Sequence, residues 1–270
     1  MEQFISVAFE ADEATTAMVT ALLMDKGFEG AEEREKGTIV TISKHLFAPE
    51  TVKDIFAKFA VSYSVETVDQ QNWNAQWESS FEPVRVNDFA AIRASFHPPV
   101  TGVAHEIVIT PKMSFGTGHH ATTFLMIQEM SQLNFVNKTV TDFGTGTAVL
   151  AILAEKLGAK KVLAIDNDEW SINNANENIV ANNCNRITLQ KGEEMEPAQV
   201  DVVLANINLN VIIANIQKIK KACGSESKIL LSGLLMQDEE TIKETLLTNG
   251  FTIVKIEHKK NWMAILTVVA

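Results

Sequence analysis

The alternation of strand and helix patterns after residue 81 constrains the fold of this chain more than any other feature. A strand is predicted at Thr139–Phe143, a helix from the turn after it to Leu157, a second strand at Lys161–Ile165 and a second helix at Glu169–Asn182. Three more strand patterns follow at Ile187–Gln190, Val200–Ala205 and Lys228–Leu231, with helical segments between them. Alternation of this kind predicts an open parallel sheet with helices on both faces.

The end of the chain departs from this alternation, because two strand patterns follow each other directly. Phe251–Glu257 and Trp262–Val269 are separated only by a short polar turn. Strands joined in this way form a hairpin, so one of them must run antiparallel to the rest of the sheet. Dehydrogenase domains that bind dinucleotides do not usually end like this. The pattern predicts an α/β fold with a Rossmann-like, seven-stranded sheet and a terminal antiparallel hairpin.

The segment 1–68 shows a different pattern of short elements. Strands are predicted at Phe4–Phe9, Phe28–Glu35, Thr38–Lys44 and Ser62–Val68, and helices at Asp12–Lys26 and Pro49–Phe59. The order β-α-β-β-α-β predicts a small ferredoxin-like α+β domain. It has 12 acidic and 6 basic side chains, a net charge of −6, and no cluster of residues typical of catalysis. We expect a substrate-recognition domain at 1–68, the alternative being a purely structural one.

Residues 69–80 are predicted to form a linker helix that leads into a second domain at 81–270. Trp73 and Trp77 lie four residues apart and would share one helical face. Packing of the linker against a neighbouring domain explains them better than contact with a substrate, although both interpretations fit.

Composition limits the partners and the compartment of the protein. The formal net charge of −11 argues against an extended electrostatic interface with nucleic acid and favours a basic partner or a small molecule. The alternative is that the acidity serves only solubility. Cys184 and Cys223 lie far apart in no paired motif, which fits a reducing compartment. There is neither an apolar run of about 18 residues nor a signal-peptide pattern. We therefore expect a cytoplasmic protein without a membrane partner.

Two glycines and a carboxylate predict a nucleoside site. Gly144 and Gly146 follow the Thr139–Phe143 strand and would let the backbone turn tightly and approach a ligand. Asp166 ends the next strand, 22 residues after Gly144, where an acidic side chain accepts hydrogen bonds from both ribose hydroxyls. Asp168 is either the alternative ligand or a helix N-cap, and capping of the following helix is the alternative role for Asp166. The glycine pair alone is a weak signal, and the spacing suits NAD and S-adenosylmethionine equally.

Asn206 stands at the end of the fourth strand of the sheet, in the run Asn206-Ile207-Asn208-Leu209-Asn210. In an open α/β sheet, ligands bind at the carboxyl ends of the strands. An asparagine there presents an amide oxygen beside the ligand, and amine methyltransferases commonly use Asn or Asp at this point to accept hydrogen bonds from the reacting amine. A simple turn residue is the alternative.

A third motif, Pro111–Thr123, precedes the helix before the first strand of the sheet. It combines glycines, hydroxyls and the aromatic ring of Phe115, which suits a loop that folds over a cofactor. We expect no metal here, because His119 and His120 are adjacent and would rarely converge on one ion.

These motifs together resemble those of the bacterial ribosomal protein L11 methyltransferases, the PrmA family. The run Phe115-Gly116-Thr117-Gly118, followed by His120 and Thr122-Thr123, is similar to the family's signature loop. Similarity extends to Asp142–Gly146, Leu150-Ala151-Ile152, Ala164-Ile165-Asp166, Ala205-Asn206-Ile207, Leu231-Ser232-Gly233, the Trp73/Trp77 linker and Trp262-Met263-Ala264. The resemblance covers essentially the whole chain.

The resemblance implies a class I methyltransferase fold that uses S-adenosylmethionine. It implies cofactor contacts at Thr123, Gly144, Asp166 and Asn206, with Phe115, Gly116 and Thr117 shaping the loop around the methionine part and the methyl group. It also implies methyl transfer to amino groups of ribosomal protein L11, on lysine side chains or the N-terminal amine. Another protein or a small-molecule amine is the alternative acceptor.

Asn206 is our candidate for orienting the amine, and no side chain stands out as a dedicated base. The chain departs from the family pattern at four places. His119 and Ala121 replace Thr and Pro, Ala148 replaces a glycine, and Asn208-Leu209 replace a Leu-Ala pair. These departures put the fine geometry of the acceptor pocket in doubt. Two other functions compete. The terminal hairpin disfavours an NAD-dependent dehydrogenase, and the acidic charge disfavours a non-catalytic RNA-binding module.

Overall fold

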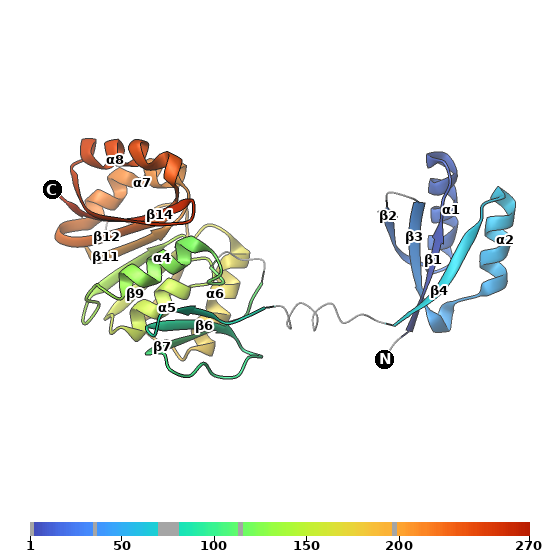
Figure 1. The fold of residues 1–270 in the computed structure, drawn as a ribbon, viewed down its shortest axis with the longest axis horizontal. Coiled ribbons are helices and arrows are strands. Elements are labelled where there is room, and N and C mark those ends of the chain that lie inside the picture. Colours follow the sequence, from blue (N-terminus) through green and yellow to red (C-terminus); the bar gives the residue numbers. More distant parts are fainter. Residues whose placement is uncertain (1–2, 35–36, 70–80, 113–115, 196–198) are drawn as a thin grey trace. The chain divides into compact units, whose positions relative to one another are not determined.

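The chain divides into two units, residues 1–80 and 81–270, each with a hydrophobic core of its own. The computed structural model describes residues 3–34, 37–69, 81–112, 116–195 and 199–270 (Figure 1). Apart from residue 69, the predicted linker helix with Trp73 and Trp77 lies outside these ranges. No helix within them is long and apolar enough to cross a membrane.

The first unit, in its described part, shows the element order β-α-β-β-α-β that the sequence predicts. The elements are β1 (Gln3–Phe9), α1 (Glu13–Asp25), β2 (Glu29–Arg34), β3 (Gly37–Ser43), the short 3-10 helix η1 (Lys44–Leu46), α2 (Pro49–Phe59) and β4 (Tyr63–Asp69). The sheet order is β2-β3-β1-β4, and each neighbouring pair is antiparallel. Alternate side chains of β1, Ile5, Val7 and Phe9, are buried with residues of α1 and α2, as expected for a sheet with helices on one face.

The second unit begins with a small sheet and continues with the alternating elements. It contains β5 (Val84–Val86), β6 (Ala90–Ala94), β7 (His105–Ile109), α4 (Ala121–Met130), β8 (Thr139–Phe143), α5 (Val149–Lys156), β9 (Lys161–Asp166), α6 (Glu169–Ala181), β10 (Ile187–Lys191), β11 (Val200–Asn206), α7 (Leu209–Ala222), β12 (Cys223–Leu235), η2 (Met236–Asp238), α8 (Glu239–Thr248), β13 (Phe251–Lys259) and β14 (Trp262–Val269). We call residues 110–120, of which 113–115 are not described, the β7–α4 loop.

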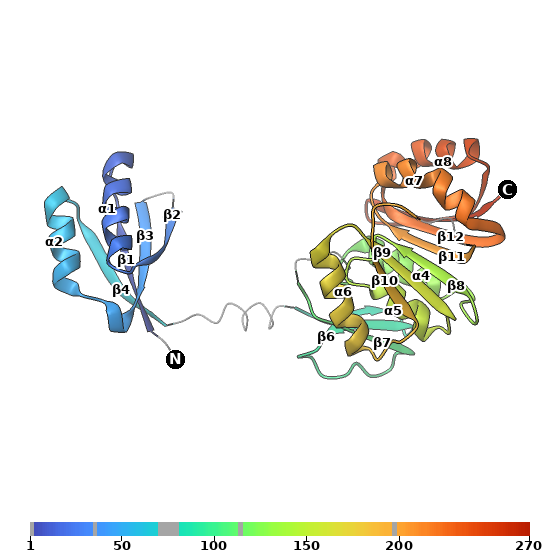
Figure 2. The ribbon, with the colours of Figure 1, turned by 180° about the vertical axis from the view of Figure 1, so that it is seen from behind.

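The large sheet confirms the predicted parallel sheet with a terminal hairpin. Its order is β10-β9-β8-β11-β12-β14-β13, and only β14 pairs in antiparallel fashion with its two neighbours, β12 and β13 (Figures 1 and 2). Strand β12 is longer than the predicted Lys228–Leu231, because it extends in both directions along its neighbours.

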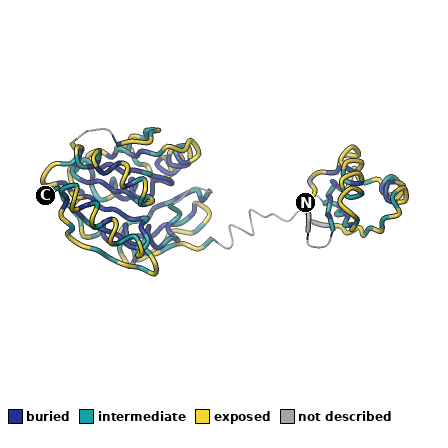
Figure 3. Tube along the Cα trace, turned by 90° about the horizontal axis from the view of Figure 1, so that it is seen from above, coloured by how far each residue is buried: buried dark blue, intermediate teal, exposed yellow. Residues whose placement is uncertain are grey.

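The two faces of this sheet carry separate cores, because successive side chains of a strand point to opposite faces. Val140, Val202 and Leu204 pack with residues of α4, α5 and α6. Phe143 and Val203 pack with residues of α7 and α8. Figure 3 shows buried segments running through this unit between exposed turns. Helices therefore cover both faces, as the alternation predicted.

The three-stranded sheet β5-β6-β7 was not predicted from the sequence. Its strands are only three to five residues long. In β6, Ala90, Ala91 and Ile92 are all buried, so this strand shows no alternation of apolar and polar residues. A strand without that alternation gives no period-two signal.

A buried carboxylate organises the turn that follows β8, which we call the glycine turn (Gly144–Ala148). Oδ2 of Asp142 accepts hydrogen bonds from Oγ1 of Thr145 (2.6 Å) and from the backbone N–H of Ala151 (3.1 Å). Its Oδ1 is buried and has no partner among the described residues. Burial, with a smaller effect of the Asp166 charge, raises the pKa of Asp142 to about 7.

The glycine turn needs backbone conformations that favour glycine. Gly144, Gly146 and Ala148 have φ values of 76°, 54° and 63°. A Cβ on Gly144 would collide with Cγ2 of Ile207, so no other residue fits there. Ala148, which replaces a glycine of the family pattern, adopts the left-handed conformation at a cost of about 1 kcal/mol. The surrounding hydrogen bonds must hold it there.

We predict that Asp142→Asn changes the pH dependence of stability. The folded protein retains the Asp142 proton up to about pH 7, whereas the ordinary pKa is 3.8. This carboxyl group therefore stabilises the fold fully below pH 4, and its contribution falls by about 1.4 kcal/mol per pH unit up to pH 7. The Asn variant keeps an acceptor for both hydrogen bonds but cannot ionise, so its stability relative to wild type should rise from pH 4 to pH 8.

Urea unfolding of both proteins across this pH range measures the difference. Asp201→Asn is a useful control, because hydrogen bonds from the backbone and hydroxyl of Thr139 lower the pKa of that carboxyl below its ordinary value of 3.8. Its contribution changes only below about pH 4, so the stability of this variant relative to wild type should stay nearly constant from pH 4 to pH 8. Parallel pH profiles for wild type and Asp142→Asn would show that Asp142 is already ionised in the folded protein.

Candidate active site

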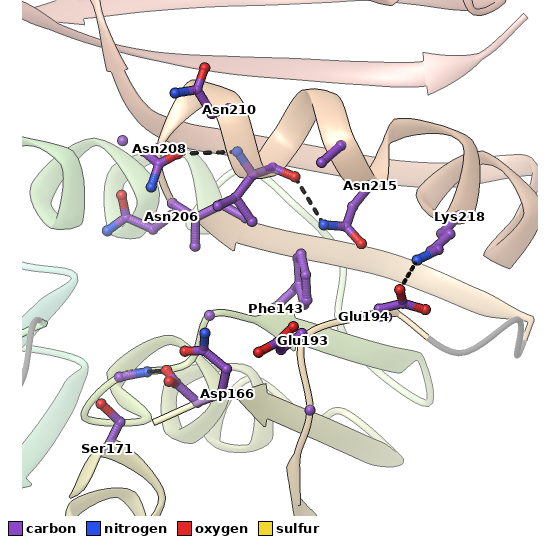
Figure 4. A pocket seen from close by; sticks show the side chains of 18 of the residues that line it. Phe143, Asp166, Ser171, Glu193, Glu194, Asn206, Asn208, Asn210, Asn215 and Lys218 are labelled. Atoms are coloured by element: carbon purple, nitrogen blue, oxygen red, sulfur yellow. Dashed lines mark hydrogen bonds and ion pairs between the residues drawn. The ribbon is translucent and has the colours of Figure 1, made fainter. Parts of the chain in front are cut away.

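A cavity of about 910 Å³ lies at the carboxyl ends of the central strands of the large sheet. Its lining includes Gly144 after β8, Asp166 at the end of β9, Gly192 after β10 and Asn206 at the end of β11, together with residues of α7 (Figure 4). Strand order reverses between β8 and β11, and ligands of open α/β sheets bind at such a reversal. The volume suits a nucleoside-sized ligand.

Four of the eight site residues predicted from sequence line this cavity: Gly144, Gly146, Asp166 and Asn206. They come from the ends of three different strands, β8, β9 and β11, which are well separated along the chain. Parallel strands bring them together because all their carboxyl ends meet at one edge of the sheet.

The other four predicted residues lie elsewhere or outside the described residues. The carbonyl of Gly116 accepts a hydrogen bond from Oγ1 of Thr147 (2.9 Å), so Gly116 packs on the glycine turn. Thr117 is half-buried in the β7–α4 loop. Thr123 is fully buried in α4, and its Oγ1 has no partner among the described residues. None of these three contributes to the described lining, and Phe115 is not described.

Asp166 and Asp168 have different structural roles. Oδ2 of Asp166 accepts a hydrogen bond from the N–H of Gly146 (2.8 Å), and Oδ1 accepts one from the N–H of Asp168 (3.0 Å). The carboxylate of Asp168 caps α6 by accepting from the N–H of Ser171 (3.0 Å), and this bond lowers the pKa of Asp168. The capping role considered for Asp166 is therefore wrong, and each Asp166 oxygen retains a lone pair for a ligand.

Asn206 and Asn208 also differ in role. Asn208 caps α7, because its Oδ1 accepts a hydrogen bond from the N–H of Val211 (3.1 Å). Asn206 is the last residue of β11, and its Oδ1 is buried without a partner among the described residues. An unpaired buried acceptor costs free energy, so this oxygen has the character of a group reserved for a ligand.

Sequence reasoning missed Asn215, which lies on the α7 side of the cavity. Its side chain is 5% exposed, its Nδ2 donates to the carbonyl of Val211 (3.0 Å), and its Oδ1 is buried without a partner in the described structure. Figure 4 shows Asn206 and Asn215 on one side of the cavity and Asp166 and Glu193 on the other. Nothing in the α7 sequence distinguishes this asparagine from an ordinary helical one.

His120 lines the cavity too. The sequence placed it in the loop that resembles the family's signature but did not predict it as a site residue. It is the N-cap of α4, and its Nδ1 lies 2.7 Å from Oγ1 of Thr122. Its ring contacts the edge of Trp262 at 4.5 Å between centroids. Burial, and to a lesser degree the charge of Lys260, lowers the pKa of His120, which favours the neutral imidazole.

The charge of the cavity is acidic. Asp166, Glu193 and Glu194 line it, and Lys218, which is paired with Glu194, is the cation among the described lining residues. Asp142 lies two residues before Gly144, behind the lining. A wall of this kind favours a ligand with positive charge.

Comparison with known proteins agrees with this geometry. The family model described as "Ribosomal protein L11 methyltransferase (PrmA)" matches residues 5–269. A ribosomal protein L11 methyltransferase of Phocaeicola vulgatus is 34% identical over 275 residues, covering 97% of this chain and 98% of the relative. One of Bacteroides fragilis is 35% identical over 262 residues, covering 94% of each chain.

A solved structure supports the same relationship. The ribosomal protein L11 methylase of Lactobacillus delbrueckii subsp. bulgaricus aligns with a TM-score of 0.66 and 27% identity, covering 70% of this chain and 99% of that one. The family match spans nearly every residue, and the two relatives named above match along nearly their whole length. This chain belongs to the ribosomal protein L11 methyltransferase family.

Proposed function

We propose that this chain transfers methyl groups from S-adenosylmethionine to ribosomal protein L11, on lysine side chains or on the N-terminal amine. Membership of the family supports the reaction and the protein acceptor. Nitrogen as the methylated atom is what the resemblance to the family implies, and the asparagine at the end of β11 supports it. A different protein or a small-molecule amine is the alternative acceptor.

The observation that carries the choice of cofactor is the acidic cavity. S-adenosylmethionine has two positive groups, a sulfonium and an ammonium, and one carboxylate. Its net positive charge fits a lining that contains Asp166, Glu193 and Glu194 against Lys218. NAD would bring a pyrophosphate with two negative charges, which these carboxylates would repel. The glycine turn and Asp166 fit both ligands, but the negative charge of the lining favours S-adenosylmethionine over NAD.

The residues have distinct roles in this proposal. Gly144 and Gly146 leave room for the cofactor against the backbone, and Asp166 accepts hydrogen bonds from the ribose hydroxyls. The resemblance to the family adds a cofactor contact at Thr123 and gives Phe115, Gly116 and Thr117 the role of shaping the loop around the methionine part and the methyl group. When bound, the cofactor supplies a methyl group on a sulfonium, which is a good leaving group, so the chain mainly positions the reactants.

The acceptor amine must be neutral to react, and an unperturbed lysine has a pKa near 10.4. The buried Oδ1 of Asn206 lacks a described partner and can accept a hydrogen bond from this amine, which orients its lone pair. We assign no dedicated base, and the amine proton leaves to water.

Residues 1–68 are the proposed substrate-recognition unit. They have their own core and a net charge of −6, which suits a basic protein partner. The described structure contains Cys184 and Cys223 as free thiols, which agrees with our proposal of a cytoplasmic protein.

Asp166→Ala should weaken cofactor binding by roughly ten- to a hundredfold, or about 1–3 kcal/mol, because ligand hydroxyls lose their acceptor in a partly buried site. Titration calorimetry with S-adenosylmethionine measures this. Asp168→Ala is the matched control, because it removes the cap of α6 and leaves the Asp166 carboxylate in place. Equal losses in both variants would mean that Asp166 acts only on the local fold.

Asn206→Ala should reduce turnover by roughly a hundredfold, because a misplacement of about 1 Å costs a factor of that size. Cofactor affinity should change much less. Asn206→Asp should retain part of the activity and improve as pH rises, because a carboxylate stabilises the unreactive ammonium form of the acceptor. Steady-state kinetics from pH 7 to pH 10 measure both effects.

Asn210→Ala serves as the control, since this asparagine lines the same cavity at an exposed position of α7. It should retain nearly full turnover. Wild-type turnover in both Asn206 variants would reduce Asn206 to a strand-end residue and would contradict the proposed orientation of the amine.

The proposed substrate and the role of the first unit are tested together. Purified L11 incubated with the full chain and methyl-labelled cofactor should carry label on lysines or on its N-terminal amine, as located by mass spectrometry. A chain that starts at Gln70 should bind the cofactor normally, because the cavity lies wholly in the second unit. It should lose at least about tenfold in kcat/KM for L11.

For the full chain, added salt should weaken the interaction with L11, because exposed charges are screened. Label on another protein of a cell lysate, with none on L11, would favour the alternative acceptor. Full activity of the shortened chain on L11 would contradict a recognition role for residues 1–68.

A further inference from the structure

Helix α6 and the residue that follows it carry three asparagines on one face, at the four-residue spacing of successive helical turns. Asn174 and Asn178 are fully buried, and Asn182 is half-buried. All three bond to the backbone of Val108 and Thr110, at the end of β7. Neither the recognition of the cofactor nor that of the amine uses this cluster.

The asparagines take the place of a neighbouring strand. Strand β7 is the edge of the small sheet and pairs only with β6 in the described structure, so its other side presents backbone groups that no strand pairs. The Oδ1 of Asn182 accepts from the N–H of Val108 (3.0 Å), and its Nδ2 donates to the carbonyl of the same residue (2.6 Å). Nδ2 of Asn174 donates to the carbonyl of Thr110 (3.1 Å). These contacts support β7 and need no further role.

Asn178 differs from its two neighbours because its amide joins two separate segments. Its Oδ1 accepts a hydrogen bond from the N–H of Thr110 (2.7 Å), the first residue of the β7–α4 loop. Its Nδ2 donates to the carbonyl of Thr147 (2.9 Å), inside the glycine turn. One buried side chain therefore fixes the start of the loop relative to the turn that faces the cavity.

The loop meets the turn a second time at the same residue. Oγ1 of Thr147 donates to the carbonyl of Gly116 (2.9 Å). Gly116 has a φ of 105°, and a Cβ there would lie 2.6 Å from the Thr147 Oγ1. Both polar groups of the peptide between Thr147 and Ala148 are paired. Its carbonyl accepts from Asn178, and its N–H donates to the carbonyl of Thr145 (2.9 Å). Thr147 is thus the point at which Asn178 and the loop converge.

We infer that Asn178 is a positioning residue, which sets the place of the described parts of the β7–α4 loop relative to the glycine turn and so the place of His120 in the cavity lining. The loop ends at His120, which lines that cavity. The glycine turn has independent supports in Asp142 and Asp166. Loss of the Asn178 amide should therefore affect the rate of methyl transfer more than the affinity for the cofactor. The inference rests on the proposed function.

The kinetic test compares Asn178→Ala with Asn182→Ala. Both remove hydrogen bonds to the backbone around β7, but only Asn178 reaches the glycine turn. Asn178→Ala should lower kcat for L11 at least about tenfold, with the Kd for S-adenosylhomocysteine within about threefold of wild type. Asn182→Ala should keep kcat within about twofold of wild type, even if its Tm falls as far as that of Asn178→Ala. Equal kcat losses in the two variants, or wild-type kcat in Asn178→Ala, would overturn the inference.

A second measurement does not depend on the substrate. Amide hydrogen exchange should speed up over residues 116–123 in Asn178→Ala, but only over residues 105–109 in Asn182→Ala. Should Asn178→Ala fail to fold, Thr147→Val breaks the link to Gly116 and should speed exchange over 116–123 in the same way. If wild type does not methylate L11, the proposed function fails, while the exchange pattern still decides the role of Asn178. Unchanged exchange over 116–123 would contradict it.

Discussion

The hydrogen bonds of two carboxylates to the glycine turn are the constraint on which the site depends. From within the fold, Asp142 binds Thr145 of the turn and Ala151 in the first turn of α5, and from the cavity Asp166 binds the turn through Gly146. Between them the backbone adopts left-handed conformations at alternate residues, one of them an alanine. The turn is strained and yet held in place, so it presents a preformed surface to a ligand.

Of these two groups, Asp166 also contributes to the charge of the cavity. Burial keeps Asp142 protonated well above the ordinary range of an aspartate, so it titrates near neutrality, while Asp166, Glu193 and Glu194 contribute negative charge to the lining. A sulfonium ligand finds favourable charge on this wall, and a pyrophosphate would not. The same sign recurs in the first unit, whose net charge of −6 over residues 1–68 suits a basic protein. In the proposed function, cofactor and partner are therefore selected by one kind of charge acting in two separate units.

The topology of the sheet determines which distant residues meet. Because β14 returns antiparallel between β12 and β13, Trp262 pairs with Leu235 and comes to line the cavity beside His120. The start of α4 and the last hairpin, which are far apart in the sequence, thus form one wall. Asn178 of α6 connects the start of the β7–α4 loop to the glycine turn in a similar way, so the loop before α4 is placed by contacts from several elements.

The sequence alone predicted the succession of strands and helices from Thr139 onward, the terminal hairpin and four residues of the cavity lining. It could do so because strand periodicity is a local property and because parallel strands always bring their carboxyl ends to one edge. Only the tertiary structure decided that Asp168 rather than Asp166 caps α6, that β5, β6 and β7 form a second sheet, and that Asn215 and His120 reach the cavity. Those outcomes depend on which face of an element is covered and by what. Periodicity reports that a face is buried, but it carries no information about the partner that buries it.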